Sequence, residues 1–291
     1  MISQYDLETS RVVVKRTRYG LMMFNRNDII IGRSLDRYGE WTEGEMDLLR
    51  PVIRPGDLVL DIGANIGTHT LAFANLVGPT GAVVAFEPQP TVFNILAANL
   101  ALNNADQVRA FNAAVGAGVG GAGGGLIQVP RTAPDRPANF GDLHLRWDAP
   151  GAATDAVPLM AIDALELQAC KLIKVDVQGM EAEVLRCASA TIARHRPILY
   201  VECEVVDQAR ELIGLILAGG YDIYWHLVPY FSHLNYYDNQ DNVFAHLRPA
   251  QNLLCVPTEQ KIPVSGLDPC RGEDDDCDQA LQRVIGAQQR G

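Results

Sequence analysis

The feature that most constrains the fold is an alternation of apolar strands and helical segments that begins at residue 58. A strand at 58–61 leads through a glycine-bearing turn into a helix near 66–76, and a strand at 82–86 leads into a helix near 90–102. Strands that alternate with helices pair in parallel through right-handed crossovers. These strands are continuously apolar, as expected when helices cover both faces of a sheet. The chain is therefore predicted to have an α/β fold.

The alternation continues along the chain with one long interruption. Residues 116–160, rich in Gly and Ala and then in Pro, Asp and Arg, are predicted to form an irregular insertion with a strand at Leu143-His144-Leu145. Residues 226–249 are rich in Tyr, Asn and Asp and are expected to form a long loop. The other expected elements are strands at 108–112, 171–175, 198–202, 221–225 and 253–256, and helices near 180–194 and 206–218.

Two segments flank this main domain, which is predicted to cover residues 51–257. Residues 1–50 should form a cap with a hairpin at 11–16 and 20–24 and a third strand at 29–31. A capping box of Thr42 and Glu45 should open a lead-in helix that reaches about Arg50. Residues 258–291 carry a run of acidic residues, and we expect a flexible, solvated tail with one weak helix.

The first turn and the second strand predict a site for a nucleoside. Glycines in Asp61-Ile-Gly-Ala-Asn-Ile-Gly67 tolerate positive φ and let a ligand approach the backbone, and the following helix offers unpaired N–H groups. Glu87 ends the next strand, where its carboxylate can accept hydrogen bonds from both hydroxyls of a ribose. A purely structural strand–turn–helix is the alternative, but it does not explain why turn and carboxylate occur together.

The turn also favours one nucleoside ligand over another. A dinucleotide site needs the pattern G-x-G-x-x-G/A, whose middle glycine admits the pyrophosphate. Here Asn65 stands at the middle position and Thr68 at the last. S-adenosylmethionine has no phosphate and tolerates an asparagine there, so it is favoured over a nicotinamide dinucleotide.

A second strand–turn–helix lies at residues 172–181. Asp176 ends its strand and Gln178 lies in the turn. Ligands of open α/β sheets bind at the carboxyl ends of strands, so Asp61, Glu87 and Asp176 should gather along one edge of the sheet. Asp176 could equally serve as a helix N-cap, and its spacing does not decide between the two roles.

Composition excludes several partners. The chain has 291 residues, with 35 acidic and 24 basic side chains and a net charge of −11, which argues against nucleic acid or an anionic membrane as partner. No apolar run is long enough to span a membrane and no secretory signal is visible, so a cytoplasmic protein is expected. The six cysteines form no C-x-x-C pair and are expected to be free thiols, and no tight metal-ligand spacing is present.

These motifs together resemble the FkbM-type methyltransferases. The resemblance runs from about Tyr38 to Val256. It implies a class I methyltransferase fold, with a seven-stranded, mostly parallel sheet, helices on both faces and a final antiparallel hairpin. It also implies S-adenosyl-L-methionine as cofactor and O-methylation as activity. The segments that carry it are Asp61–Gly67, Glu87-Pro88, Ala98-Asn99-Leu100 with Asn103, Ala114-Val115-Gly116, Ile173–Glu181 and Glu183-Val184-Leu185.

Transferred position by position, the resemblance implies a set of cofactor-binding residues. The turn would line the methionine end, Glu87 would hold the ribose, and Asp176 would face the junction of cofactor and acceptor. The family pattern Asp-Val-Glu-Gly has Gln178 here, and an amide cannot act as a base at neutral pH. The full set is Asp61, Gly63, Asn65, Gly67, Thr68, Glu87, Pro88, Asn112, Ala113, Asp176 and Gln178.

For the catalytic residues and the acceptor, the sequence leaves several candidates. Asp176, His226 and His233 are the candidates for catalysis. His69 and His144 are further candidates for a base, but His69 could as easily serve packing and His144 lies in the insertion. The expected acceptor is the hydroxyl of a sugar or polyketide-like product. A carboxylic acid acceptor and a cofactor-binding protein that has lost turnover are the alternatives, and a homo-oligomer stays open. A nicotinamide-dependent oxidoreductase is disfavoured by the turn.

Overall fold

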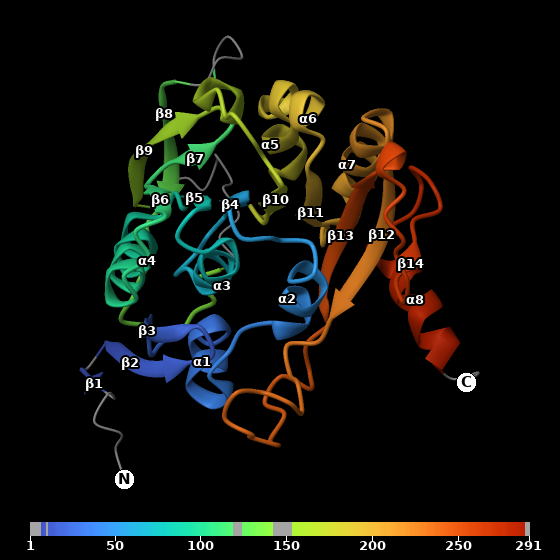
Figure 1. The fold of residues 1–291 in the computed structure, drawn as a ribbon. Helices are drawn as coiled ribbons and strands as arrows, with labels where there is room; N and C mark the ends of the chain where they lie inside the picture. The colour runs from blue at the N-terminus through green and yellow to red at the C-terminus, as the bar shows by residue number, and fades with distance from the viewer. Residues whose placement is uncertain (1–6, 10, 119–123, 142–152, 289–291) are drawn as a thin grey trace.

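A sheet of eight strands in the order β14-β12-β13-β11-β10-β4-β5-β6 forms the centre of the molecule (Figure 1). The structure is a computed structural model and describes residues 7–9, 11–118, 124–141 and 153–288. Strands β6, β5, β4, β10 and β11 are parallel, whereas β13 pairs antiparallel with both β11 and β12. The strands are β4 (Leu58–Ile62), β5 (Ala82–Phe86), β6 (Val108–Phe111), β10 (Leu172–Val175), β11 (Ile198–Glu202), β12 (Tyr221–Val228), β13 (Ala250–Pro257) and β14 (Asp268–Pro269).

This topology confirms the class I methyltransferase fold, with one correction. Seven strands give the expected mostly parallel sheet and its closing antiparallel hairpin. The eighth strand, β14, comes from the C-terminal segment and pairs with Tyr224 and Trp225 of β12. A two-residue strand has too little periodicity to be read from sequence, because its pairing depends on a neighbour more than 40 residues away.

Alternate residues of each strand face two separate apolar cores. In β4, Val59 packs into one core with β2 (Val12–Thr17), β3 (Gly20–Asn25) and the helices between residues 31 and 102, while Leu60 packs into a second core with the helices at 181–187 and 206–218. Because both faces are covered, the strands are apolar throughout, which is the pattern that predicted them. The helices are α1 (Ile31–Tyr38), α2 (Glu43–Leu49), α3 (Thr68–Val77), α4 (Pro90–Leu102), α5 (Glu181–Cys187), α6 (Ser189–His195), α7 (Val206–Ala218) and α8 (Cys277–Gln288).

The single helix predicted near 180–194 is two helices that meet at Ala188. The backbone N–H groups of Ala190 and Thr191 donate to the carboxylate of Asp163 at 2.9 and 2.8 Å. Asp163, in the short 3₁₀ helix η1 (Ile162–Leu165), thus caps α6 from outside the helix. A cap supplied from 27 residues away leaves no local signal, so the break was not predicted.

The N-terminal segment forms part of the core rather than a separate layer. Its hairpin is confirmed as β2 (Val12–Thr17) and β3 (Gly20–Asn25), but the third strand is β1 (Leu7–Glu8) and not 29–31, since α1 starts at Ile31. The lead-in helix α2 is confirmed without its capping box. Thr42 has φ +40 and makes no side-chain cap bond, because Glu45 is buried and turned towards His69.

The insertion and the C-terminal segment are more regular than expected. Strands β7 (Ala114–Val115), β8 (Leu126–Pro130) and β9 (Thr154–Met160) form a small sheet of their own, separate from the central sheet and from the sheet β1-β2-β3. The predicted strand at 143–145, with His144, lies outside the described residues.

The C-terminal segment contains the predicted helix, as α8, and Glu273, Asp274 and Asp278 are exposed, but the segment is not solvated throughout. Asp275 is buried, accepts a hydrogen bond from Trp225 Nε1 at 3.1 Å and pairs with Arg283 at 2.8 Å. Together with β14, the helix α8 therefore fixes this segment against β12. No helix among the described residues is long and apolar enough to cross a membrane.

Candidate functional site

A cavity of about 580 Å³ opens where the parallel strands end. Glu87 and Pro88, after β5, lie at one end of it, called here the Glu87 end. Tyr230, after β12, and Trp41, whose ring stacks on Tyr230, lie at the other end, because four strands separate β5 from β12 in the sheet. This is called here the Trp41 end, and Asp176 also lines the cavity. The volume falls in the range of pockets that bind small molecules and cofactors.

The turn after β4 is shaped for close backbone approach. A Cβ atom on Gly63 would lie 1.7 Å from the carbonyl oxygen of Asp176, and φ at this residue is +84. Asn65 also has a positive φ, of +50, and its Oδ1 accepts from the N–H of Ile66 at 2.8 Å. Asparagine tolerates the left-handed conformation, so this residue closes the turn where a dinucleotide site would need glycine.

Glu87 is held rigidly by the backbone around it. Its Oε2 accepts from the N–H of Asn65 at 3.0 Å and its Oε1 accepts from the N–H of Gln89 at 2.8 Å. Burial raises the pKa of Glu87 to about 7, although these two N–H groups act in the opposite direction. Each oxygen keeps a lone pair, so the carboxylate can accept two further hydrogen bonds from a ligand.

The Glu87 end is closed by two segments distant in sequence. Ile30 and Ile31 line it from the N-terminal segment, and Asn139 and Gly141 line it from the insertion. The two segments meet where Ile29 N–H donates to the carbonyl of Ala138 at 3.1 Å. A ligand at Glu87 would therefore be covered by residues outside the parallel strands.

A buried lysine joins the two acidic turns. Lys174 is 3% exposed, and its Nζ lies 3.1 Å from Asp176 Oδ2 and 3.7 Å from Asp61 Oδ1. Burial disfavours its charged form, but the carboxylates of Asp176 and Asp61 outweigh burial and raise the pKa of Lys174. Lys174 in turn outweighs burial at Asp176 and lowers the pKa of that carboxyl. Asp176 is thus an ionised carboxylate in the cavity wall.

Asp61 supports this arrangement without reaching the cavity. It is fully buried, and Thr70 Oγ1 donates to its Oδ2 at 2.6 Å. The strands β4 and β10 place Asp61 directly beside Lys174. The expected gathering of Asp61, Glu87 and Asp176 is found, but only Glu87 and Asp176 line the cavity.

His69, in the first turn of α3, lines the cavity as a neutral side chain. Its Nε2 lies 3.4 Å from Thr42 Oγ1 and 3.5 Å from Glu45 Oε2. Burial, followed by the charge of Lys174, lowers the pKa of His69 to about 3, and burial raises the pKa of Glu45 to about 7. The helix α2 thus brings a buried carboxyl behind the cavity wall.

Gln178 acts as a hydrogen-bond donor between two carboxylates. Its Nε2 lies 3.0 and 2.8 Å from the two oxygens of Glu202 and 3.3 Å from Asp176 Oδ1. Its backbone has φ +55. A glutamate at position 178 would place a third carboxylate, which cannot donate, beside Asp176 and Glu202. The amide of Gln178 can donate to both, which explains why it suits the position.

The Trp41 end is aromatic on one side and acidic on the other. The rings of Trp41 and Tyr230 are stacked, with centroids 5.1 Å apart and an interplanar angle of 24°. Glu202, at the end of β11, and Glu204 line the same cavity. Arg248 also lines it, but its Nη2 pairs with Asp278 at 2.5 Å.

The structure separates the predicted residues into two groups. Of the cofactor set, Gly63, Asn65, Thr68, Glu87, Pro88, Ala113, Asp176 and Gln178 line the cavity. Asp61, Gly67 and Asn112 do not line it. Gly67 packs against Leu96, and Asn112 Nδ2 donates to the carbonyls of Glu87 and Pro88, so Gly67 and Asn112 shape the site from behind.

Neither histidine predicted to be catalytic lines the cavity. His226 lies in β12, where Nδ1 is 2.9 Å from the hydroxyl of Tyr200, and burial lowers its pKa to about 4. His233 is exposed and contacts Gln240. Of the histidines and aromatic residues at 226–249, Tyr230 and His246 line the cavity.

Several cavity residues were not predicted, and some had a signal. Lys174 is a charged residue inside an otherwise apolar buried strand, which is rare unless it is paired. Glu202 ends a parallel strand, as Asp176 does. Trp41 and Gln251 carried no such signal, because tertiary contacts alone bring their segments to the cavity.

Comparison with known proteins gives a family match. The model of the FkbM methyltransferase domain matches residues 61–237, more than half of the chain. A 47-residue stretch is 55% identical to the 31-O-demethyl-FK506 methyltransferase FkbM of Streptomyces tacrolimicus, and it covers 16% of this chain and 18% of that protein.

Solved structures are similar at a lower level. An FkbM methyltransferase from Methylobacillus flagellatus is 19% identical with a TM-score of 0.42, over 72% of this chain and 50% of that one. The chain therefore spans half the length of that protein. Aeropyrum pernix fibrillarin, solved with natively bound S-adenosyl-L-methionine, is 14% identical with a TM-score of 0.43, over 88% of this chain and 100% of that one.

Proposed function

The chain belongs to the FkbM methyltransferase family, and we propose that it transfers a methyl group to an oxygen atom of a small-molecule hydroxyl acceptor. S-adenosyl-L-methionine is the cofactor of this family. It supplies an activated methyl group together with its leaving group. The protein's task is then to bind the cofactor and align the acceptor oxygen, a positioning effect worth several kcal/mol and up to roughly 7–11.

The observation that carries the proposal is one cavity that joins a nucleoside-binding end to a second, separately lined end. At the first end, Glu87 presents two fixed carboxylate oxygens, and Gly63 lines the cavity without a side chain. These residues fit an adenosyl cofactor. The Trp41 end then remains for the acceptor, with Asp176 in the wall.

The charges at the Trp41 end support a hydroxyl rather than a carboxylic acid as acceptor. Asp176 and Glu204 line the cavity, and a carboxylate placed beside the ionised Asp176 would be repelled. Burial, followed by the charge of Asp176, raises the pKa of Glu202, so that carboxyl adds less to the repulsion. The cations of the lining, Lys174 and Arg248, are paired with Asp176 and Asp278. A hydroxyl can instead donate to the carboxylate oxygens of the lining. Asp176 is kept ionised by Lys174, so it can orient an acceptor hydroxyl, although its lowered pKa makes it a weak base.

Isothermal titration calorimetry and a methyl-transfer assay test this function. S-adenosylhomocysteine should bind to the wild type and NAD should not. Tritiated S-adenosyl-L-methionine should then label an alcohol in a panel of methyl α-D-glucopyranoside, cyclohexanol and benzoic acid. An ether product survives alkali, whereas a methyl ester is hydrolysed. An alkali-labile product would replace the proposal with carboxyl methylation.

The same assays separate a working enzyme from a protein that has lost turnover. Gln178 in place of the family's glutamate is the observation behind that alternative. Binding of S-adenosylhomocysteine without transfer to any acceptor would favour it. The absence of binding would contradict both ideas.

A further inference from the structure

We propose that Glu40 is a positioning residue for the acceptor, because it fixes the aromatic wall of the Trp41 end. The proposal rests on the function proposed above, which assigns that end to the acceptor. Glu40 itself does not line the cavity. It acts by joining the N-terminal segment to the segment 229–249, each of which supplies one ring of the wall.

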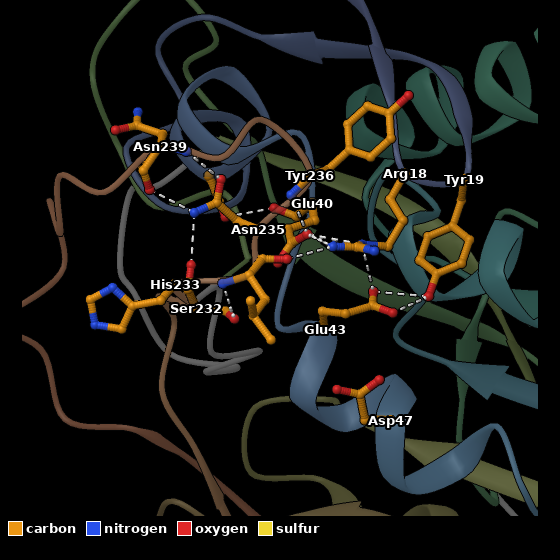
Figure 2. Close-up of polar contacts among 12 residues, drawn as sticks. Arg18, Tyr19, Glu40, Glu43, Asp47, Ser232, His233, Asn235, Tyr236 and Asn239 are labelled. Carbon is orange, nitrogen blue, oxygen red and sulfur yellow. Dashed lines mark hydrogen bonds and ion pairs between the residues drawn. The ribbon is translucent and has the colours of Figure 1, made fainter.

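Three chain segments converge on the carboxylate of Glu40 (Figure 2). Arg18 donates to its Oε2 from Nε at 2.9 Å and from Nη2 at 2.5 Å. The backbone N–H of Tyr236 donates to the same oxygen at 2.8 Å. Arg18 Nη2 also donates to the carbonyl of Leu234 at 3.0 Å. The ion pair therefore holds both the hairpin β2–β3 and the segment 229–249.

The ion pair is well shielded on the glutamate side. Glu40 is 5% exposed, and burial raises its pKa although Arg18 acts in the opposite direction. Arg18 also lies 3.6 Å from Glu43, which is bound to Tyr19 and Arg50. A buried carboxylate needs such partners. Removing the charge of Glu40 should therefore loosen the two segments that Glu40 and Arg18 join.

Further contacts join the N-terminal segment to the segment 229–249. Tyr237 N–H donates to the carbonyl of Tyr38 at 3.1 Å, and the hydroxyl of Tyr38 donates to the carbonyl of Asp241 at 2.8 Å. The aromatic ring of Tyr38 packs against Phe244 with centroids 5.9 Å apart. Figure 1 shows the orange segment after β12 lying beside the blue α1.

The connection ends at the cavity wall. Trp41 follows Glu40 directly, and its ring stacks on Tyr230 of the other segment. Tyr230 packs in turn against Phe244, with centroids 6.0 Å apart. Trp41 lies outside the matched family region of 61–237. The position of this wall therefore depends on a segment that the family domain does not include.

The test compares Glu40→Gln with Asp47→Asn. Glutamine keeps the size but loses the charge, which weakens the bonds to Arg18. Asp47 is also acidic and lies four residues after Glu43 on α2, but it is exposed and its carboxylate pairs with Arg50 at 2.9 Å. In Figure 2 it lies apart from the contacts of Arg18 and Glu40. Glu40→Ala removes the group altogether and serves as the stronger variant, with its melting temperature measured to show that it folds.

Two readouts need no acceptor. In Glu40→Gln, amide hydrogen exchange in residues 234–240 should be about tenfold faster, because a charged hydrogen bond becomes a neutral one. Acrylamide quenching of Trp41, taken as the difference from the same variant carrying Trp41→Phe, should rise about twofold as the ring leaves its stack. Asp47→Asn should change neither.

Two further readouts separate positioning from general damage. The affinity for S-adenosylhomocysteine should stay within about twofold of wild type, since Glu40 is not part of the Glu87 end. With methyl α-D-glucopyranoside as acceptor probe, KM should rise about tenfold while kcat at saturation stays within about threefold.

Unchanged hydrogen exchange and unchanged quenching in both Glu40 variants would overturn the proposal. A loss of affinity for S-adenosylhomocysteine as large as the rise in KM would also overturn it. If wild type fails to bind S-adenosylhomocysteine, the proposed function fails. The exchange and quenching results are measured independently of that outcome.

Discussion

At the scale of single residues, the site depends on carboxylates whose partners are fixed before any ligand arrives. Both oxygens of Glu87 accept backbone N–H groups, so the carboxylate cannot rotate away from the cavity. Because the residue is also buried, the cost of keeping it charged appears as a pKa raised to about 7. A raised pKa at this position makes cofactor binding sensitive to pH.

We predict that cofactor affinity falls as the pH drops below about 7. Protonated Glu87 has one oxygen that no longer accepts freely, so ribose hydroxyls bind the ionised form better. The Kd of S-adenosylhomocysteine should rise about tenfold between pH 8 and pH 6, as measured by calorimetry. Glu87→Gln should bind roughly 10- to 100-fold more weakly at pH 8 and lose most of this dependence.

Glu45 provides the control, because its pKa is also raised to about 7. It lies behind His69 and does not line the cavity. Glu45→Gln should therefore keep the pH dependence of binding. A flat profile in Glu45→Gln, or an unchanged one in Glu87→Gln, would contradict the assignment of the ribose to Glu87.

Lys174 is predicted to stabilise the fold through its charge. Replacing it in Lys174→Met leaves Asp61, which is fully buried, without its cation, and this should cost about 3–5 kcal/mol in the free energy of unfolding. Urea denaturation measures the loss. Asp61→Asn in the same background should restore part of it, whereas Lys171→Met, three residues earlier and partly exposed, should have little effect. Equal losses at both lysines would refute the role of the buried pair.

At the scale of elements, contacts between distant segments decide where elements begin and what they cover. Asp163 divides the predicted helix at Ala188. The C-terminal segment seals β12, because Trp225 is 1% exposed and its indole N–H is bound to Asp275. An acidic run that reads as solvated thus contains one buried carboxylate paired with Arg283.

We predict that Arg283→Met destabilises the protein by about 1.5–3 kcal/mol, because Asp275 loses two charged hydrogen bonds. The emission of Trp225 should shift to the red as β14 and α8 loosen. Arg210→Met removes an exposed pair with Asp274 and should cost about 0–1 kcal/mol. Equal effects of the two substitutions would show that the segment does not depend on its buried pair.

At the scale of the whole molecule, the N-terminal segment and the sheet share one apolar core. Phe24, Leu35, Met46 and Leu49 are at most 1% exposed and pack in the cluster that contains Val59 of β4. The same segment closes both ends of the cavity through Ile31 and Trp41. Removing it would therefore expose the core and open the site together.

A chain that starts at residue 51 is predicted to lose cooperative unfolding and cofactor binding. It should bind the dye ANS and show no sharp thermal transition, since a face of the sheet is left uncovered. Among the described residues, a chain that starts at residue 10 loses the pairing of β1 with β2 and the hydrogen bonds of Thr9 to Arg11 and Val12, but it keeps the apolar core and should unfold like the full chain. A shortened chain from residue 51 that melts cooperatively would show that the cap is dispensable.

Sequence alone was sufficient for the parallel sheet and for the part of the Glu87 end that the parallel strands and their turns supply. The apolar strands, the turn at Gly63 and Asn65 and the carboxylate of Glu87 are close in the chain, and local backbone geometry relates them directly. Helices and strands bounded by such local signals, as in β5 and α4, begin and end where they were predicted.

The tertiary structure alone decided the Trp41 end and the supporting charges. Trp41, Glu202 and Tyr230 come from segments far apart in sequence, and the Arg18–Glu40 pair joins segments about 200 residues apart. No local pattern specifies such contacts, because they depend on packing across the sheet. For the same reason, the sequence grouped Asp61 with the ligand-binding carboxylates, whereas the structure buries it beside Lys174 and outside the cavity lining.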